Sequence, residues 1–457
     1  MTDWTIIRRS LSARAFSSVT TVITVAVAVA LMLVLLTLRE AGKRAFERGV
    51  GDMHLLVTAE ASPLASVLNS VFYASPPRNP LAWERYEQLL AQAPWAYTVP
   101  IQMGDSYMGQ PVLATTSAFF EKFRPNVGEP WELEQGRYFT QDFEVVLGHA
   151  AAATTGLKLG DKIVLTHGTP SSRDSSGSFS NGGAAEEAAH VHEEYSYVVV
   201  GVLKPTGGAH DRALITNLES TWIIHAHDRI EKEERTAHGD EAHHDHHDHE
   251  GHDGHEHAHQ VTANDLIDSD RKITAVYLRL VTREGSQIPA NLPQVFETLR
   301  RDRTLNVAAP FDEIRKLDII VGNVNRLFIG VAAAVMLSSG IAIMLALYNS
   351  MDQRKRQVAI FRVLGASRPR VFGLVLTESV VLGLAGAALG IALGLGGSLL
   401  AADVLKDRIG LVVPIVMPAR ELLVVCLATV AIAALAGVLP ALRAYRTSVF
   451  ENLRPTD

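Results

Sequence analysis

The sequence of 457 residues has a single cysteine, Cys426, so the chain can form neither an internal disulfide nor a cysteine-based zinc or iron–sulfur site. No stretch matches G-x-x-x-x-G-K-[ST], which excludes a P-loop for nucleotide phosphates within the sequence. An excess of basic residues is also missing: 42 Lys and Arg stand against 49 Asp and Glu, a formal net charge of −7. That balance does not favour a nucleic-acid-binding protein. No arrangement of nucleophile, base and acid emerges, so the sequence predicts no catalytic site.

Hydrophobic residues make up 47% of the chain, and they are gathered in four blocks, at about 17–38, 325–348, 371–400 and 422–442. Each block is long enough to cross a bilayer as a helix, which takes about 20 residues. A signal peptide is the alternative for the first block. Its apolar run is longer than that of a typical signal peptide, and no A-x-A cleavage site follows it. We therefore interpret all four blocks as retained transmembrane helices.

Basic residues in short loops predict the orientation of these helices. The loop at 349–370 and the tail at 443–457 are rich in arginine, which places both in the cytoplasm. Four spans then place residues 1–16 in the cytoplasm as well. The basic stretch 39–48 disagrees, although two glutamates partly offset its charge. The sequence thus predicts a multi-pass membrane protein with both termini in the cytoplasm.

This orientation leaves one large periplasmic segment, 39–318, and one short periplasmic loop, 401–421. Strand-like and helix-like patterns alternate along the large segment, which predicts an α+β domain. The strand candidates are His54–Thr58, Val112–Thr116, Val145–Leu147, Lys162–Thr166, Tyr195–Leu203, Ala213–Thr216 and Ile273–Val281, and the helix candidates are Pro80–Gln92, Ser117–Phe123, Ala150–Thr155 and Leu292–Asp302. Residues 39–48 and 311–323 predict two stalk helices next to the first two spans. The expected fold class is four transmembrane helices plus a large α+β extracytoplasmic domain.

Two inserts interrupt this domain. Residues 169–189 are rich in Gly and Ser and then in Ala and Glu, which is typical of a flexible loop. Residues 230–264 are highly charged and contain the histidine tract, residues 238–259, in which 10 of 22 residues are His and 7 are Asp or Glu. Nothing in the tract can build an apolar core, so we expect it to be disordered without a ligand.

The histidine tract is the most distinctive chemical feature of the sequence. Imidazole binds zinc, nickel and copper(II) well, and carboxylates can complete such sites. The expected ligands are His238, His243, His244, His246, His247, His249, His252, His255, His257 and His259. We predict multi-site, loosely selective and pH-dependent binding, most plausibly of Zn²⁺, with Ni²⁺ or Cu²⁺ as alternatives. The competing interpretations are a solvated polar loop and a pH sensor.

Two features of the spans also stand out. Gly386, Gly390, Gly394 and Ser398 recur at four-residue steps, which predicts a face for close helix packing, either within the subunit or across a dimer. Glu378 lies about two turns inside the third span, where a carboxylate has to face protein or water, or be protonated. We interpret Glu378 as a structural hydrogen-bonding group or a link to gating rather than as part of a proton relay.

The cytoplasmic stretch MDQRKRQVAIFRVLGASRPR combines a basic face with apolar residues. Gly365 is expected to end a short helix, and Pro369 to begin the next one. The apolar set suits docking into a groove of a partner, and a membrane-surface amphipathic helix is the alternative. The candidate docking residues are Arg354, Arg356, Val358, Ile360, Phe361, Val363, Leu364 and Gly365.

At this point the chain resembles a known family. RKRQVAIFRVLGASRPRVFGLVLTES, with the Gly-rich span after it and the ending GVLPALRAYRTSVFENLRP, resembles the C-terminal module of FtsX-like ABC-transporter permeases, a group that includes MacB, LolC/LolE and FtsX. VVLGHAAAATTGLKLGDKIVLTHG and YVVVGVLKPTGGAHDRALITNLE are similar to two signatures of the MacB-like periplasmic core domain, in the same order. The resemblance covers most of the chain except the two inserts.

The resemblance implies a non-catalytic permease subunit that works as a homodimer or with a homologous permease. Such a pair binds two cytoplasmic ATPase subunits through the coupling helix, here 349–370, and transmits their motion to the periplasmic domain. The sequence departs from the family at Gln357, where an acid is usual, in having no fused ATPase, and in the histidine-rich insert.

Three functions follow as expectations. The first is a permease subunit linked to zinc handling or to export or extraction of an envelope substrate. The second is a non-transporting scaffold of FtsX type that activates a periplasmic partner. The third, which the coupling motif disfavours, is a metal sensor or store with a membrane anchor.

Overall fold

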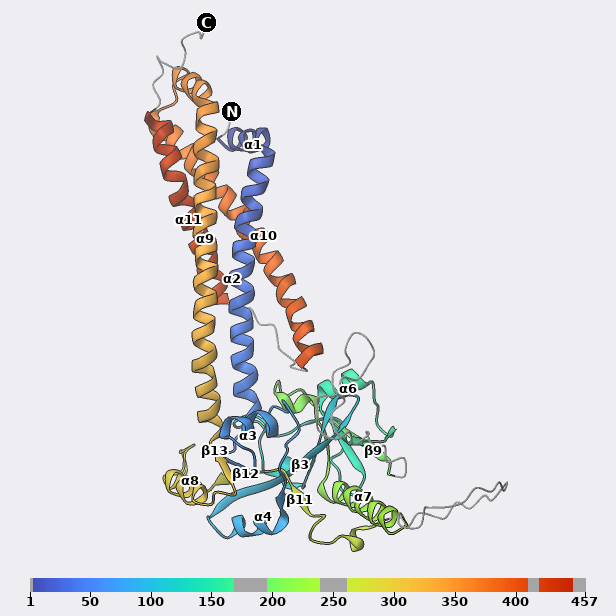
Figure 1. Cartoon of the computed structure of the whole chain (residues 1–457). Helices are drawn as coiled ribbons and strands as arrows, with labels where there is room; N and C mark the ends of the chain where they lie inside the picture. Colours follow the sequence, from blue (N-terminus) through green and yellow to red (C-terminus); the bar gives the residue numbers. More distant parts are fainter. Residues whose placement is uncertain (1–2, 168–194, 239–260, 410–418, 447–457) are drawn as a thin grey trace, which may run out of the picture. The chain divides into compact units, whose positions relative to one another are not determined.

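The computed structural model describes residues 3–167, 195–238, 261–409 and 419–446 (Figure 1). The chain divides into two compact units. We name them the helical unit, which comprises Met1–Lys43, Asp318–Arg408 and Val413–Asp457, and the sheet unit, which comprises Arg44–Leu317 and Ile409–Val412. The predicted loop 169–189, the histidine tract beyond residue 238 and part of the predicted loop 401–421 lie outside the described residues.

The helical unit contains five of the described helices: α1 (Asp3–Ala13), α2 (Ala15–Gly49), α9 (Pro310–Val363), α10 (Arg368–Ile409) and α11 (Ala419–Arg446). Among the described residues, four stretches are long and apolar enough to cross a membrane: Ala15–Arg44, Pro310–Met351, Arg368–Ala402 and Ala419–Arg446. They contain the four blocks expected from the sequence. Side chains such as Val29, Met336 and Ala433 pack together in one apolar core between these helices.

Helix α9 contains the stalk segment and the second span, which the sequence predicts to be continuous, and it also runs on into the coupling segment, which was expected to be a separate short helix. It is one helix of 54 residues, from Pro310 to Val363. Asp312 and Glu313 lie in its first turn and Arg362 in its last, which complements the helix dipole at both ends. The expected break before the coupling helix is absent because residues 345–363 contain no glycine or proline to interrupt the helical hydrogen bonds.

The sheet unit is built around an 11-stranded mixed sheet with the strand order β13-β1-β12-β3-β4-β10-β6-β9-β5, while β7 pairs with β9 and β8 with β3. Its strands are β1 (Leu55–Thr58), β3 (Trp95–Tyr107), β4 (Gln110–Thr115), β5 (Leu133–Gly136), β6 (Glu144–Leu147), β7 (Lys162–Ile163), β8 (Thr166–His167), β9 (Tyr197–Leu203), β10 (Leu214–Asn217), β12 (Ala275–Leu280) and β13 (Asn306–Ala308). A second sheet pairs β2 (Leu81–Ala82) with β11 (Lys272–Ile273). Pairing is parallel between β10 and β4 and between β6 and β9.

The long strand β3 is the centre of this sheet. It pairs with β12 on one side and forms a hairpin with β4 on the other, with Tyr107 opposite Gln110. The two residues of the turn, Met108 and Gly109, have φ angles of 49° and 78°. Two residues with positive φ are the requirement of the type I′ turn that matches the twist of a hairpin.

Alternate residues of each strand point to opposite sides of the sheet, so the apolar strands present a hydrophobic surface on both faces. Helices cover both of these faces. On β1, Leu56 joins an aromatic core with residues of α3 (Pro63–Ser70), α5 (Ala118–Glu121) and the 3₁₀ helix η1 (Ala209–Arg212). Leu55 and Val57 face a second core with α4 (Trp83–Leu90), α7 (Leu218–His238) and α8 (Leu292–Arg300). A third core lies around β6, β9, α7 and α6 (His149–Thr155), and η2 (Ala263–Asp265) lies near α7.

The two signature segments of the sequence meet in this unit. β6 pairs with both β9 and β10, and η1 lies against the loop that follows β6. Gly148 is the contact point: a Cβ atom there would lie 2.4 Å from the carbonyl oxygen of Asp211 and 2.5 Å from that of His210. The close approach of the two segments therefore requires glycine at this position.

Candidate functional site

The turn between α9 and α10 is the first part of the candidate site. The backbone N–H of Ala366 donates to the carbonyl oxygen of Phe361 at 3.0 Å, and that of Gly365 donates to Arg362 at 3.1 Å. Gly365 has a φ angle of +97°, which a residue with a side chain adopts only with strain. α10 then begins at Arg368, one residue before Pro369. Because the turn is short, the last residues of α9 remain at the surface of the helical unit.

The predicted docking residues divide into an exposed group and a buried one. Ile360, Val363 and Leu364 are 49%, 63% and 77% exposed, and we name them the apolar tip. Phe361 is half-buried and Gly365 is exposed. The side chains of Arg354 and Arg356 lie outside the described part of the chain.

Val358 belongs to the buried group, with only 8% of its surface exposed. It packs with Met351 from α9, Val371 and Val375 from α10, and Ala441 from α11. A residue held in this way cannot contact a partner protein, so Val358 supports the tip from within the subunit. The sequence pattern did not distinguish this role from docking.

Two arginine–aromatic contacts hold the same end of the helical unit together. The guanidinium carbon of Arg443 lies 4.1 Å from the ring centroid of Tyr348, and that of Arg368 lies 5.8 Å from the ring centroid of Tyr445. Such cation–π contacts link α9 to α11 and α10 to α11. They give the apolar tip a fixed base, and no sequence motif had indicated them.

Glu378 of α10 is buried and lies at the centre of a polar network. Ser10 Oγ donates a hydrogen bond to Glu378 Oε1 at 2.8 Å, and Arg14 Nη2 donates to the same oxygen at 2.9 Å. Ser10 lies on α1 and Arg14 between α1 and α2. A buried carboxylate is tolerated where a cation and a hydroxyl compensate its lost hydration. The network therefore ties the N-terminal residues to α10.

The glycine face of α10 packs against α2 of the same chain. A Cβ atom on Gly386 would lie 2.5 Å from Val25 Cγ1, and one on Gly390 would lie 2.6 Å from Val29 Cβ. On Gly394 the nearest atom, Leu33 Cβ, would lie at 3.2 Å, and Ser398 is buried. The four-residue steps thus serve close contact between α2 and α10, where a bulkier side chain would separate the helices.

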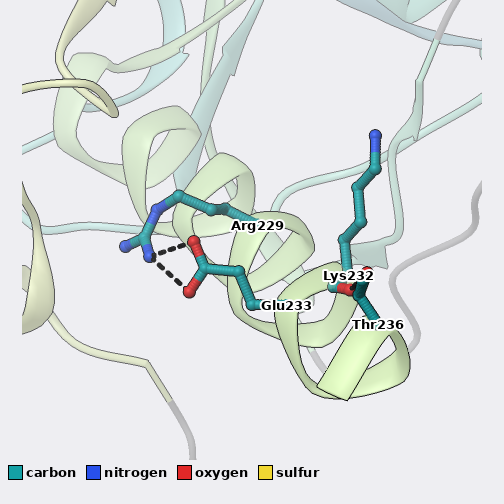
Figure 2. Close-up of a pocket in the computed structure, with 4 residues that line it drawn as sticks. All are labelled: Arg229, Lys232, Glu233 and Thr236. Carbon is teal, nitrogen blue, oxygen red and sulfur yellow. Dashed lines mark hydrogen bonds and ion pairs between the residues drawn. The ribbon is translucent and has the colours of Figure 1, made fainter. Parts of the chain in front are cut away.

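The histidine tract cannot be placed, since His243 to His259 lie outside the described residues and the side chain of His238 at the end of α7 is also undescribed. α7 does extend through residues 230–238, so the first part of the predicted insert is helical. An open hollow on α7 is lined by Arg229, Lys232, Glu233 and Thr236 (Figure 2).

This hollow offers little for binding chemistry. Arg229 donates to both carboxylate oxygens of Glu233, at 3.3 and 3.4 Å, and forms a two-point ion pair with Asp270, at 2.8 and 3.0 Å. The partners of Arg229 hold its pKa above the usual range, chiefly through the hydrogen bonds to Asp270. In Figure 2 the side chain of Lys232 extends away from this pair.

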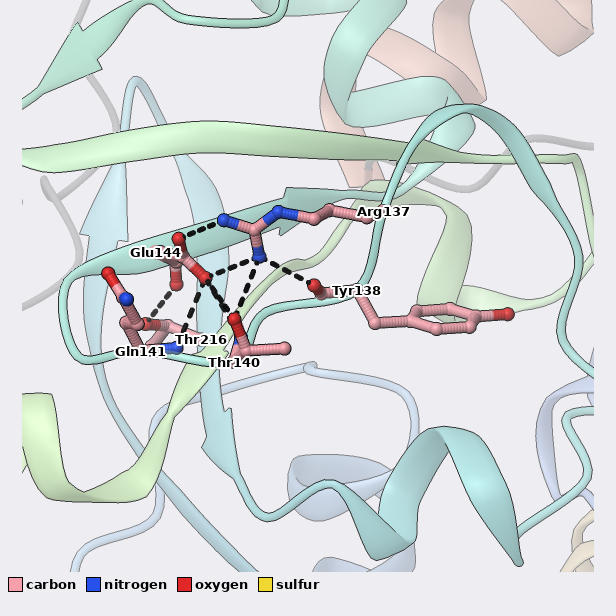
Figure 3. A network of polar contacts seen from close by, with 6 residues as sticks. All are labelled: Arg137, Tyr138, Thr140, Gln141, Glu144 and Thr216. Atoms are coloured by element: carbon pink, nitrogen blue, oxygen red, sulfur yellow. Dashed lines mark hydrogen bonds and ion pairs between the residues drawn. The ribbon is translucent and has the colours of Figure 1, made fainter.

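A second polar network, centred on Glu144, closes the loop between β5 and β6 (Figure 3). Arg137 binds both carboxylate oxygens of Glu144, one of them at 2.7 Å. The backbone N–H groups of Thr140 and Gln141 donate to Oε2 at 2.8 and 3.1 Å. These hydrogen bonds, that of Arg137 first, lower the pKa of Glu144 to about 2. The network orders a loop and holds no open ligand position.

His210 of η1 is a completely buried titratable residue of the second signature segment. Its Nδ1 forms a 2.5 Å hydrogen bond with the hydroxyl of Tyr73, and its ring lies edge-on to those of Phe119, Phe123 and Trp131. Burial lowers the pKa of His210 to about 4, so the ring is neutral near pH 7. A neutral imidazole enclosed by aromatic rings stabilises the fold and is not accessible to a metal ion.

Two family models match separate parts of the chain. Residues 18–239 match the family model of the MacB-like periplasmic core domain, and residues 329–449 match that of the FtsX-like permease C-terminal domain. Among solved structures, the extracellular domain of the noncanonic ABC-type transporter YknZ from Gram-positive bacteria is similar at 11% identity, with a TM-score of 0.26, over 56% of this chain and 98% of that chain. That score is too low to support an argument. No curated protein matches the chain.

Proposed function

Because the chain belongs to the FtsX-like ABC-transporter permeases that carry a MacB-like periplasmic core domain, we propose that it is the transmembrane subunit of an ABC transporter of the bacterial inner membrane. Two cytoplasmic ATPase subunits bind a pair of these permeases, either two copies of this chain or this chain and a homologue. Both termini lie in the cytoplasm, and residues 44–317 lie in the periplasm.

The exposed apolar tip carries this proposal. Ile360, Val363 and Leu364 are large apolar side chains on a surface, next to residues rich in arginine. Packing of Val358 beneath them and the cation–π contacts of Arg443 and Arg368 keep the tip in place. A rigid apolar knob with a basic surround suits insertion into a groove of a partner protein.

Helices α9 and α2 provide a route for the resulting motion. α9 continues without a break from the apolar tip to Pro310, and Ile314 near its start is buried in the aromatic core of the sheet unit. Phe46 near the end of α2 packs on the same core. ATP-driven closure of the ATPases would displace the tip. The displacement therefore reaches the sheet unit through α9 and α2, because a residue of each helix packs in the aromatic core of that unit.

The test is ATPase activity in the assembled complex. The permease is co-purified with the ATPase encoded beside it, and the ATPase rate is measured with wild-type chain and with Leu364→Asp. A charge on the tip should abolish co-purification and leave the ATPase at its uncoupled rate. Val281→Asp is the matched control, because Val281 is also an exposed apolar residue, at 58%, but lies in the sheet unit.

Two outcomes contradict the proposal. The first is normal assembly and ATPase activity with Leu364→Asp and with the combined change Phe361→Asp and Leu364→Asp. The second is labelling of a cysteine introduced at Ser367 by a membrane-impermeant reagent from the periplasmic side, since no cytoplasmic ATPase could then contact the turn.

We further propose that the histidine-rich segment binds transition-metal ions, with zinc as the preferred ion, so that the complex acts in metal handling. The support is its composition of 10 His and 7 acidic residues in 22 positions. Calorimetric zinc titration of the full chain and of a chain without residues 238–259 tests this. Equal zinc uptake by the two proteins would exclude a role of the tract in metal binding.

A further inference from the structure

Helix α7 carries a group of metal-ligating side chains that belongs to neither the histidine tract nor the apolar tip. His227, Asp228 and Glu231 each offer one ligand atom, and these atoms lie within 4.8 Å of one another. Residues three or four apart lie next to each other on a helix. Glu231 is four residues after His227 and three residues after Asp228, so its side chain can meet both. We propose that these three residues form a binding site for one divalent transition-metal ion, with Zn²⁺ as the best fit.

The ligand chemistry favours a borderline metal ion. One imidazole nitrogen and two carboxylate oxygens are a donor set that zinc accepts, with bonds of about 2.0–2.2 Å. Two tetrahedral ligands at that distance are about 3.4 Å apart. The three ligand atoms already lie within 4.8 Å of one another, so small side-chain adjustments bring them to that spacing. Three protein ligands leave one position for water or a further ligand.

The packing of α7 makes this a positioned site. Ile223, Ile224 and Ala226, in the turn before the three ligands, are buried in the cores of the sheet unit. The ring of His227 lies edge-on to Tyr195, with centroids 5.4 Å apart, and Tyr195 is itself buried. Ligands on a helix fixed in this way lose little conformational freedom on binding a metal ion.

The neighbouring arginine does not compete for the two carboxylates of the site. Asp270 and Glu233 bind the guanidinium group of Arg229, and Figure 2 shows the pairing with Glu233. The cation is therefore used in an ion pair within the sheet unit.

This inference rests on the geometry of α7 alone and is independent of the proposed transport function. The test uses the full-length protein with residues 238–260 replaced by a short Gly/Ser linker, which removes all ten histidines of the tract. Zinc titration with a competing fluorescent chelator should give one zinc ion per chain. His227→Ala and Glu231→Gln should each weaken this binding at least tenfold.

The matched control is His149→Ala. His149 is also a histidine beside a carboxylate, with Nδ1 3.0 Å from Glu134, but within the described part of the chain it belongs to no group of three ligands and should leave zinc binding unchanged. The site is excluded if the linker variant binds no zinc, or if zinc binding survives both His227→Ala and Glu231→Gln.

A second measurement covers the case in which the linker variant does not fold. In the intact wild-type protein, zinc should protect His227 from carbethoxylation by diethyl pyrocarbonate, as read by mass spectrometry of the peptide that contains it. Glu231→Gln should abolish the protection. Equal modification of His227 with and without zinc would overturn the proposal.

Discussion

Replacement of His210 by asparagine should remove an acid-sensitive contribution to the stability of the sheet unit. The His210 ring is completely buried, and its Nδ1 pairs with the Tyr73 hydroxyl. Among the described residues, no hydrogen-bond partner meets its Nε2. A proton added to this ring would introduce a charge among the rings of Phe119, Phe123 and Trp131, where water cannot hydrate it.

The size of the effect follows from the pKa of His210, which burial lowers from 6.5 to about 4. The unfolded chain binds the proton below pH 6.5, whereas the folded chain binds it only near pH 4. Stability is therefore complete above pH 6.5 and is lost as the pH falls from 6.5 to about 4. At about 1.4 kcal/mol per pH unit, the full loss is about 3 kcal/mol, of which about 2 kcal/mol is reached at pH 5.

The assay is denaturant unfolding of the full-length protein in detergent between pH 5 and pH 8. With the other four tryptophans replaced by phenylalanine in both proteins, fluorescence of Trp131 provides a local signal, because its ring centroid lies 5.7 Å from that of His210. In His210→Asn the amide oxygen can still accept a hydrogen bond from Tyr73 but does not titrate. The free energy of unfolding of the wild type should fall by about 2 kcal/mol more between pH 7.5 and pH 5 than that of the variant.

The comparison of two variants separates this residue from all other histidines. Every other histidine is common to the wild type and to His210→Asn, so their titration cancels in the difference. If wild type and His210→Asn lose stability in parallel between pH 7.5 and pH 5, the argument from burial is wrong.

Three further predictions concern the polar networks and the glycine face. Arg14→Met and Glu378→Leu should each destabilise the helical unit by about 3–5 kcal/mol, because each leaves a buried charge without its partner. In a double-mutant cycle of thermal unfolding, the double variant should lose clearly less than the sum of the two single losses. Additive losses would contradict the ion pair. Gly390→Val should lower the free energy of unfolding by about 1–3 kcal/mol through overpacking against α2. Gly396→Val should not lower it, because an added Cβ there meets nothing within 4 Å. Equal unfolding temperatures of the two variants would contradict the packing. Arg137→Met should raise the pKa of its carboxylate partner in β6, so that stability is lost at a higher pH on acidification; an unchanged acid midpoint would refute this.

The sequence predicted the elements that have a clear local pattern. The four apolar blocks appear inside α2, α9, α10 and α11 because a bilayer span leaves an unmistakable run of apolar residues. The candidates at Val145–Leu147 and Tyr195–Leu203 correspond to β6 and β9. Both are short apolar runs bounded by polar residues or glycine, a pattern that points to buried strands.

Central strand β3 was missed because local rules argue against it. Its sequence, WAYTVPIQMGDSY, contains Pro100 and Gly104, which usually mark an edge strand or a break. In the structure Pro100 lies opposite Val276 of β12, and its carbonyl oxygen accepts a hydrogen bond from the Thr115 hydroxyl. Pairing on both sides of the strand compensates for the missing donor, and such pairing cannot be read from a local window.

Parts of the candidate site depend on contacts between distant residues, which a single sequence does not disclose. Glu378 was noticed as a buried acid, but its partners Ser10 and Arg14 lie more than 360 positions away. His210 lies within a signature that resembles the MacB-like domain, yet its role depends on Tyr73 and a cage of aromatic rings. Composition indicated the histidine tract and suggested that His227 could join a metal site, but the grouping of His227 with Asp228 and Glu231 depends on the geometry of α7.

The unbroken course of α9 has a mechanical consequence. At 1.5 Å per residue, its 54 residues form a rod of about 80 Å, in which a twist applied at one terminus has no hinge to absorb it. Each inserted residue would turn the far terminus by about 100°, so two extra residues would reverse the direction in which it faces, and seven would nearly restore it. The direction in which one end of α9 faces is therefore fixed relative to the other end. An insertion preserves that relation only if it adds close to a whole number of helical turns.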